Sequence, residues 1–506
     1  MDRASLNRTS SGYKSLKQAS AKDYAVHAPD GHMSPSKRIP HFLIYLVFIV
    51  TLGPMQFGFH LGELNAPQAV ITCKADKLPT YGTYGLSRCI PMTSGQWSLV
   101  QSIFTIGGLF GACFSGFVAT KYGRLFAIKW LTFFLGMGPI AEALANKMWV
   151  LTMGRALSGL GAGAATVVCP IYISEVAPPD RRGLFGAFTQ VQINSGILLA
   201  QFLGYFLSKN TKWRWIPATA GFIAAVTFIG LMLAPETPKW LAANHRLRMA
   251  RGMLQRIRGK NVDIREEMEQ WEMSGEAEEE SLLGPPRGPR PPKKAGKSVL
   301  DVVRVSTYRR AVIAVTGTMI AQQLCGINAV VMYSVAILGQ IMPTRAALIT
   351  VIVSAINVIV CVLSSPLPDK IGRKTCLLMS ISGMGSASIM LAIGLEKDIQ
   401  YLTIIGLGIF VCSFGIGLGP VPFLLPSELV GPEAVGAVSS LALAGNWLST
   451  FMVAQFFPML NAAMPEGRVW WVFVGIAGFF GIFVAIFVPE SKGKASPDEV
   501  WGRKHP

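Results

Sequence analysis

The sequence has little charge for its length. Asp, Glu, Lys and Arg make up only 15% of its 506 residues, whereas soluble domains carry about 25%. Hydrophobic residues reach 51% without counting 52 glycines, and the mean hydropathy is +0.43. Too little polar surface remains to wrap a water-soluble globule of this size. The composition therefore excludes a soluble enzyme and a disordered chain.

Other signals are missing as well. Residues 1 to 40 are polar and contain no apolar core of a cleavable signal peptide. We find no metal-ligand cluster, no phosphate-binding loop and no set of nucleophile, base and oxyanion donors in an accessible segment. We therefore expect no enzymatic activity, no cofactor and no metal.

Long apolar runs dominate what is present. A membrane-spanning helix needs about 20 mostly apolar residues, and twelve such runs occur, which predicts an all-α integral membrane protein. They cover 42–64, 97–119, 125–146, 149–174, 184–207, 215–234, 311–338, 346–366, 375–395, 400–426, 434–457 and 469–488.

The basic residues predict the orientation. The net charge is +18, which by itself would suggest nucleic-acid binding, but most of the Lys and Arg lie in tails and loops on one side of the predicted spans. The positive-inside rule places that side, with both termini, in the cytoplasm. We therefore expect the protein to associate with the lipid bilayer and not with nucleic acid.

The predicted spans divide the chain into five parts. These are a cytoplasmic tail (1–40), a six-helix half (41–234), a cytoplasmic loop (235–310), a second six-helix half (311–488) and a cytoplasmic tail (489–506). The loop begins with an amphipathic helix that starts at Thr237 and Pro238. Its apolar stripe contains Leu247, Leu254 and Ile257, and this stripe could rest on the membrane surface. Its later part, rich in Pro, Gly and charge, is typical of a flexible linker.

Short motifs recur about 250 residues apart. Gly123-Arg124 returns as Gly372-Arg373, and Pro235-Glu236 returns as Pro489-Glu490, each at the same point of a six-span half. Pro170 with Glu175 likewise returns as Pro422 with Glu428. Two parallel six-helix halves joined by a long loop are typical of a transporter that binds its substrate between the halves.

The motifs resemble those of the sugar porter family of the major facilitator superfamily, which includes the glucose facilitators. The resemblance covers roughly residues 42 to 493 and rests on eleven strings in order. They are QFGFHLGELNAPQ (56–68), KYGR (121–124), GRALSGLGAG (154–163), PIYISEVAP (170–178), RRG (181–183), PETPKWL (235–241), QQLCGINAVVMYS (322–334), DKIGRK (369–374), GPVPFLLPSEL (419–429), GNW (445–447) and PESKG (489–493). It implies the major facilitator fold, with 12 transmembrane helices in two six-helix halves.

Amides and aromatic rings inside the spans form the candidate sugar site. Sugar hydroxyls both donate and accept, and a sugar also has an apolar face, so amides and rings suit it. The residues are Gln190, Gln322, Gln323, Asn328, Tyr333, Asn357, Phe423, Asn446 and Trp447, most of them matched to cavity positions of the family. Amides that only join helices are the alternative. Gln322 and Asn328 reach one ligand only if the helix bends between them, which Gly326 permits.

Two departures from the family bear on substrate and coupling. Phe423 stands where facilitators commonly have Trp, so a ring is kept and the indole N–H is lost. His60 stands where proton-coupled members have Asp, which there pairs with the Arg matched by Arg155. With Glu63 as an alternative partner of Arg155, these three are the candidate coupling residues. We expect His60 to be neutral and hydrogen-bonded, which favours a uniporter over a proton symporter.

A third set matches the family's cytoplasmic gate. In the family, these Arg and Glu residues pair in the outward-facing state and part when the site opens inward. They are Arg124, Glu175, Arg182 and Glu236 in the first half, and Arg373, Glu428 and Glu490 in the second. The family's Arg in the loop after span 10 is missing, which predicts a weaker inner gate.

Two further features concern the loops. Cys73 and Cys89 share the exoplasmic loop after span 1, where an oxidising compartment favours a disulfide over two free thiols. The acidic dileucine pattern from Glu278 to Leu283 could recruit a sorting adaptor, which leaves the plasma membrane and a vacuolar or endosomal membrane both open.

The sequence therefore predicts alternating-access transport of a monosaccharide, namely a hexose, in facilitative mode. A proton-coupled sugar symporter is the first alternative. The second is a sugar sensor that does not transport, a class expected to have long cytoplasmic extensions, whereas the tail here spans only 489–506.

Overall fold

The computed structural model describes residues 39–74, 85–178, 181–259, 262–265, 267–268, 299–494 and 496–502. Within these segments the regular structure is helical, and eleven helices are long and apolar enough to cross a membrane. A further helix of 26 residues, α7, lies between two of them in the sequence. The twelve together agree with the twelve predicted spans.

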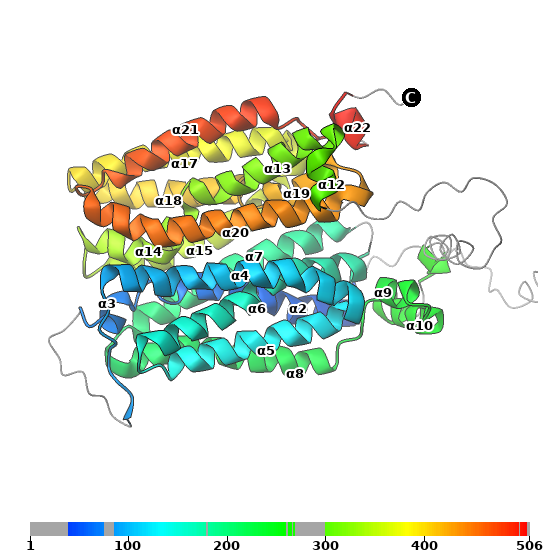
Figure 1. The fold of residues 1–506 in the computed structure, drawn as a ribbon, viewed down its shortest axis with the longest axis horizontal. Helices are drawn as coiled ribbons and strands as arrows, with labels where there is room; N and C mark the ends of the chain where they lie inside the picture. Colours follow the sequence, from blue (N-terminus) through cyan, green and yellow to red (C-terminus); the bar gives the residue numbers. More distant parts are fainter. Residues whose placement is uncertain are drawn as a thin grey trace, which may run out of the picture.

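Six long helices form the first half of the bundle. They are α2 (His41–Gly62), α4 (Ser94–Tyr122), α5 (Arg124–Ala143), α6 (Met148–Val176), α7 (Arg182–Leu207) and α8 (Trp215–Met232), with the short α3 (Gln68–Ile71) and η3 (Asn210–Arg214) between them. Figure 1 shows these helices running side by side along the long axis of the molecule.

The second half repeats this arrangement with two of its helices interrupted. It consists of α13 (Ser306–Leu324) with α14 (Ile327–Gly339), α15 (Ala346–Ser364), α17 (Arg373–Glu396), α18 (Gln400–Ile416) with α19 (Val421–Leu429), α20 (Pro432–Ala463) and α21 (Val469–Phe487). The short α12 (Val299–Arg304) and α16 (Leu367–Ile371) precede α13 and α17. The predicted spans 311–338 and 400–426 are thus each broken into two helices.

The second break has a local cause. Pro420 and Pro422 remove backbone donors just where α18 would continue into α19. At Gly417 the helices approach so closely that a Cβ atom would overlap the carbonyl of Cys376. The chain therefore turns there before a new helix begins.

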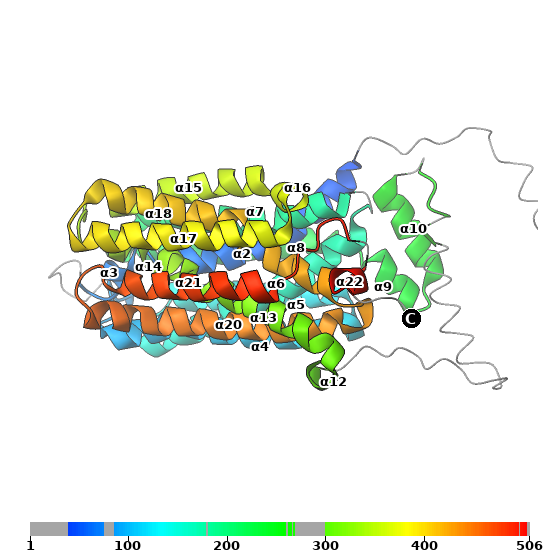
Figure 2. The same cartoon turned by 90° about the horizontal axis from the view of Figure 1, so that it is seen from above.

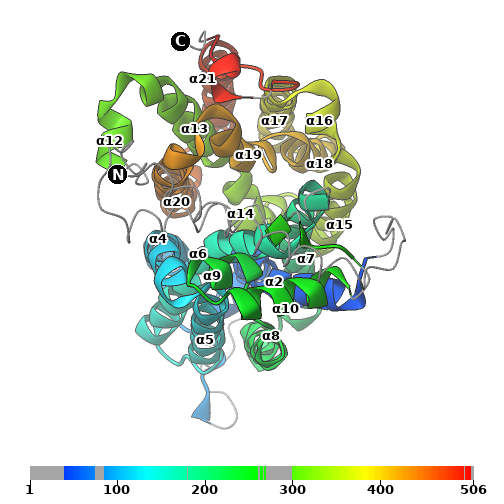
Figure 3. The same cartoon turned by 90° about the vertical axis from the view of Figure 1, so that its right-hand side faces the viewer.

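Seen along the bundle, the two halves lie against each other as separate groups (Figure 3). Helix α4 packs on α20 and α7 packs on α15, so these two pairs form the seams between the halves. Large apolar side chains on the outside are exposed, among them Phe222 at 68% and Ile486 at 69%. An apolar exterior over most of the length of the helices is what a lipid environment requires.

One end of the bundle carries additional short helices, α9 (Pro238–Ala243), α10 (Leu247–Arg258) and α22 (Pro497–Val500) (Figure 2). We call it the α9–α10 end. The predicted amphipathic helix is two helices, because His245 adopts a positive φ of 58° between them. Leu254 and Ile257 are buried and Leu247 is exposed, so α10 uses its apolar stripe largely to pack on protein.

Candidate functional site

Four of the predicted amides join in one hydrogen-bonded network between α13, α14 and α20. The Asn446 side chain donates to Gln322 Oε1 (2.6 Å), and Gln323 donates to Asn446 Oδ1 (3.2 Å). Asn328 completes the network by donating to Gln323 Oε1 (2.5 Å). All four side chains are at least 90% buried. We call this set the amide cluster.

The amide cluster depends on the break between α13 and α14. Gly326 begins α14 with φ 102°, a left-handed conformation that favours glycine. A Cβ atom there would come within 2.8 Å of Phe473 Cδ1. The interruption brings Asn328 within hydrogen-bonding distance of Gln323, so the bend expected between Gln322 and Asn328 is present.

The backbone around α18 and α19 also serves the amide cluster. The Gln322 amide donates to the carbonyl oxygens of Leu418 (2.6 Å) and Gly419 (3.1 Å), both in the break between these helices. Carbonyl groups freed from a helix are tolerated inside a membrane protein only where they find such partners or line a cavity. Both interrupted helices therefore meet at this cluster.

The other predicted binding residues make no side-chain hydrogen bond to the amide cluster among those described. Tyr333 is buried and donates to the carbonyl of Ala454 (2.7 Å). Gln190 on α7 is half-buried and its amide lies 3.5 Å from Asn194 Oδ1. Asn357 on α15 is buried, and its Oδ1 has no hydrogen-bond partner within the described segments. Phe423 is 45% exposed.

Trp447 is the predicted site residue that touches the opposite half. Its ring is buried and lies on Gly108 of α4 so closely that a Cβ atom there would overlap it. The rings of Phe57 (5.5 Å between centroids) and Phe104 (6.4 Å) stand edge-on to it. Trp447 thus connects the amide cluster to the first half.

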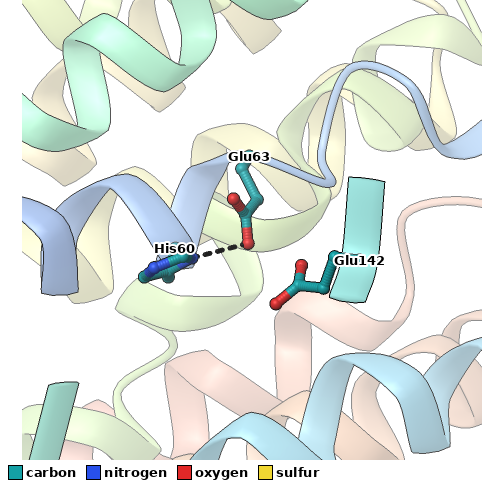
Figure 4. Close-up of side chains that lie close together, drawn as sticks. All are labelled: His60, Glu63 and Glu142. Carbon is teal, nitrogen blue, oxygen red and sulfur yellow. Dashed lines mark hydrogen bonds and ion pairs between the residues drawn. The ribbon is translucent and has the colours of Figure 1, made fainter. Parts of the chain in front are cut away.

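A second polar group lies inside the first half. His60 on α2, Glu63 directly after that helix, Glu142 on α5 and Arg155 on α6 all have an exposed fraction of 0%. His60 Nδ1 lies 2.8 Å from Glu63 Oε1, and Arg155 NH1 donates to the same oxygen at 2.5 Å. Figure 4 shows Glu142 facing the space beside Glu63. We call these four side chains the charged cluster.

The charged cluster answers the question of which residue pairs with Arg155. Its guanidinium binds the Glu63 carboxylate, whereas its contact with His60 is a hydrogen bond to the backbone carbonyl (3.0 Å). The guanidinium carbon also stands 4.6 Å from the centre of the Phe104 ring, a favourable cation–π distance.

Sequence reasoning missed Glu142. Its Oε1 accepts from the Ser158 hydroxyl at 2.7 Å. The signal was available, because an ionisable side chain within a predicted span is itself a reason to expect a functional site. Gln56 and Gln101 were also missed; both are buried, and their amide groups have no partner in the described part of the chain.

The predicted gate residues of the first half form a network at the α9–α10 end. Arg124 makes a two-pronged ion pair with Glu175 (3.0 and 2.9 Å). Glu236 accepts from the backbone N–H groups of Arg124 and Leu125 (both 3.0 Å) at the start of α5. Burial raises the pKa of the Glu236 carboxyl, against the opposing effect of those backbone donors.

The second half repeats the same construction. Arg373 pairs with Glu428 (2.8 Å), and Glu490 accepts from the backbone N–H groups of Arg373 (2.8 Å) and Lys374 (3.1 Å). Both pairs are internal to their own half. The side chain of Arg182, the remaining predicted gate residue, lies outside the described residues, as does the segment from Glu278 to Leu283.

The halves are joined by hydrogen bonds at the opposite end, where Cys73 and Cys89 form a disulfide. We call it the disulfide end. The Asn65 side chain donates to Ser334 Oγ (2.8 Å) and to the Val331 carbonyl (3.0 Å), and accepts from the Val335 N–H (3.1 Å). Asn65 follows α2, while its partners belong to α14, so these bonds close the seam at this end.

A twelve-helix bundle of two repeated halves, with a buried polar cluster inside each half, is the architecture of a major facilitator transporter. The chain belongs to the sugar transporter family: the family model described as "Sugar (and other) transporter" matches residues 46–497. Proteins of this family are transporters and not enzymes, in agreement with the sequence analysis.

Individual relatives support the same assignment. A probable metabolite transport protein of Saccharomyces cerevisiae is 32% identical over 94% of this chain and 98% of its own. The facilitated glucose transporter member 3 of solute carrier family 2 from Gallus gallus is 31% identical over 92% of each chain. The partially occluded, inward-open structure of the xylose transporter XylE from E. coli has a TM-score of 0.73 at 22% identity, covering 90% of this chain and 100% of that one.

Proposed function

We propose that this protein carries a monosaccharide, and specifically a hexose, across a membrane by alternating access in facilitative mode. The observation that carries the proposal is the amide cluster at the junction of the two interrupted helices. Four amides supply donors and acceptors in equal number, which is the combination that a polyhydroxylated ring requires. Aromatic rings of Phe57 and Trp447 beside the cluster offer an apolar surface.

In this proposal the bound sugar replaces some of the hydrogen bonds that the amides make to one another. The Gln323 amide donates to both Gln322 Oε1 and Asn446 Oδ1, at 3.3 and 3.2 Å. These are longer than the other bonds of the cluster, so they are the weaker ones to replace. Asn357, with a buried oxygen that lacks a partner in the described segments, is positioned on the neighbouring α15 to add a further acceptor.

The facilitative mode rests on the first half. His60 replaces the carboxylate of the coupled members, and its ring is held by Glu63 rather than by Arg155. A proton symporter is the alternative, because carboxyl groups are still present in the charged cluster. The orientation proposed from the basic residues puts the α9–α10 end in the cytoplasm and the disulfide in an exoplasmic loop. The plasma membrane and a vacuolar or endosomal membrane are both compatible with it.

Uptake into vesicles tests the proposal. Purified protein is reconstituted, and uptake of labelled hexoses, pentoses and polyols is measured with and without a pH gradient. We expect saturable uptake of a hexose that is indifferent to the gradient. Uptake that a proton gradient drives above equilibrium would instead establish symport, and no uptake of any sugar would refute the transport proposal.

A pair of variants links uptake to the amide cluster. Gln323→Leu removes two donated hydrogen bonds and one accepted bond, each worth about 1 kcal/mol. We expect the apparent affinity to fall by roughly tenfold or more. Gln400→Leu is the matched control, since this exposed glutamine of the same half bonds only the Ile341 carbonyl near the disulfide end among the bonds described for its side chain. Its affinity should equal that of the wild type.

A further inference from the structure

The charges of the charged cluster do not cancel when both carboxyls are ionised, and solvent does not reach the buried cluster to compensate for the excess. Arg155 contributes one positive charge and does not lose its proton in proteins. Glu63 and Glu142 are both fully buried, so two ionised carboxylates beside one guanidinium would leave a net negative charge inside the bundle. Such a charge is costly where no water or counter-ion screens it. One proton on the cluster removes it.

His60 is poorly arranged to carry this proton. Its Nδ1 lies 2.8 Å from Glu63 Oε1, but its Nε2 is buried and has no hydrogen-bond partner in the described segments. An imidazolium would place an N–H donor at that unpaired position. A neutral ring with its hydrogen on Nδ1 satisfies Glu63 and leaves only an acceptor unpaired.

The two carboxyl groups differ in what stabilises their ionised forms. Glu63 Oε1 accepts hydrogen bonds from the Arg155 guanidinium and from the His60 imidazole. Glu142 receives only the hydroxyl of Ser158 among the bonds described for its side chain. One carboxyl oxygen of each residue and a ring nitrogen of His60 lie within 4.8 Å of one another.

We propose that the charged cluster is a proton-binding site in which Glu142 carries the proton and donates it in a hydrogen bond to the ionised Glu63. The site joins α2, α5 and α6 inside one half and does not depend on which solute the transporter carries. Sharing one proton between two neighbouring carboxyls avoids the repulsion of two like charges at short range.

No other charged side chain of the packed elements takes over this role. Helix α4 presents the ring of Phe104, and α8 has no ionisable residue between Trp215 and Met232. On α7 the ionisable residues Arg182 and Tyr205 stand near the two ends. From the second half, the buried hydroxyl of Tyr333 already donates to the Ala454 carbonyl.

An arginine near the end of α5 and a bound metal ion are the other cations to consider. Arg214 binds the Ala143 carbonyl (2.7 Å), at the end of α5 rather than at the Glu142 carboxyl. A bound metal ion would have to share the oxygen of Glu63 that Arg155 approaches to 2.5 Å. The repulsion between guanidinium and metal ion disfavours that arrangement, so a proton fits the space better than a metal cation.

Infrared spectroscopy of the purified protein tests the proposal directly. A protonated carboxyl group buried in protein gives a carbonyl-stretch band that ionised carboxylates lack. We expect this band in the wild type at neutral pH and its loss in Glu142→Gln. Glu466→Gln is the control, because this exposed glutamate lies in a loop outside the cluster, and the band should stay. His60→Asn should keep the band as well.

Thermal unfolding at a series of pH values gives a second readout that a purely structural role would not reproduce. A carboxyl that must hold its proton stabilises the fold at low pH, and this stability is lost as the pH rises and the proton leaves. The Tm of the wild type should therefore fall toward alkaline pH more steeply than that of Glu142→Gln, which mimics the protonated form. The slope for Glu466→Gln should match the wild type.

The outcomes separate the alternatives. Absence of the band in the wild type, together with a protonated His60 ring in NMR spectra, would assign the proton to histidine and overturn the proposal. Stabilisation of the wild type by Zn²⁺ or Mn²⁺ that Glu142→Gln abolishes would assign the site to a metal ion and also overturn it. Neither experiment uses sugar, so failure of the transport proposal would leave these results interpretable.

Discussion

Asn65 offers a sharp test of alternating access, because its hydrogen bonds exist only when the halves meet at the disulfide end. The side chain is fully buried and bridges to Ser334, Val331 and Val335 of the opposite half. A contact present in one conformation alone stabilises that conformation. Asn65→Ala should therefore shift the protein toward the state that is open at this end.

The size of the shift follows from the three bonds. A hydrogen bond contributes about 0.5–1.5 kcal/mol net of its exchange with water. Water can reach these groups once the seam opens, so we take about 1.5–3 kcal/mol for the set. Since 1.4 kcal/mol changes an equilibrium constant tenfold, the ratio of open to closed molecules should rise roughly 10- to 100-fold.

Distance measurements between spin labels provide the assay. Labels are attached to cysteines introduced at Gly95 and Tyr401, exposed positions near the disulfide end on opposite halves, in a background without the free cysteines. Asn146→Ala is the matched control. This amide lies at the same end and bonds Ser87 and Gly85 within its own half, so its removal should leave the populations unchanged.

Two results would refute the reasoning. Identical distance distributions in the wild type and Asn65→Ala would mean that the three bonds do not distinguish the states. A shift of equal size in Asn146→Ala would mean that any loss of polar contacts at this end loosens the seam. Only a shift confined to Asn65→Ala agrees with a bond set specific to one state.

Further predictions concern single positions. Gly326→Ala places a side chain at φ 102° and 2.8 Å from Phe473, which should destabilise the fold by about 1–3 kcal/mol and lower Tm in a thermal scan; an unchanged Tm would contradict the strain argument. Cys73→Ser opens a disulfide whose partners are 16 residues apart and should remove about 3 kcal/mol of constraint, seen as faster proteolysis of that loop, with no change if the thiols are free in the native protein. Gly372→Ala displaces the Glu490 carboxylate and should cost about 1–3 kcal/mol, measured by thermal unfolding in detergent; equal stability would show that this close approach can relax.

Much of the fold could be predicted because it follows from composition and repetition. Twelve apolar runs and the recurrence of Gly123-Arg124 as Gly372-Arg373 were enough for the helix number and the two halves. The two interrupted helices were harder. Gly326 signalled the first break, whereas Pro420 and Pro422 were an available signal for the break after Ile416 that sequence reasoning did not use.

The candidate site divides in the same way. Gln322, Gln323 and Asn328 are close in the sequence, so their convergence could be inferred from one local bend. Glu142 meets Glu63 only because the fold brings α5 beside the end of α2. The spacing of residues within either helix cannot predict that contact. Sequence reasoning thus assigned Arg155 a partner on α2 and left the second carboxyl of the cluster unassigned.

The two buried polar groups belong to different halves, and aromatic rings link them. The amide cluster contains Asn446, next to Trp447, and the Trp447 ring lies on Gly108 beside Phe104. Phe104 in turn stacks against the guanidinium of Arg155 in the charged cluster. The contact of the Trp447 ring with the Phe57 and Phe104 rings contains no hydrogen bond between the halves, so this surface permits the halves to rock. A solute that moves Trp447 also changes the packing of Trp447 on Phe104. We therefore expect solute binding at the amide cluster to alter the charged cluster through these two rings.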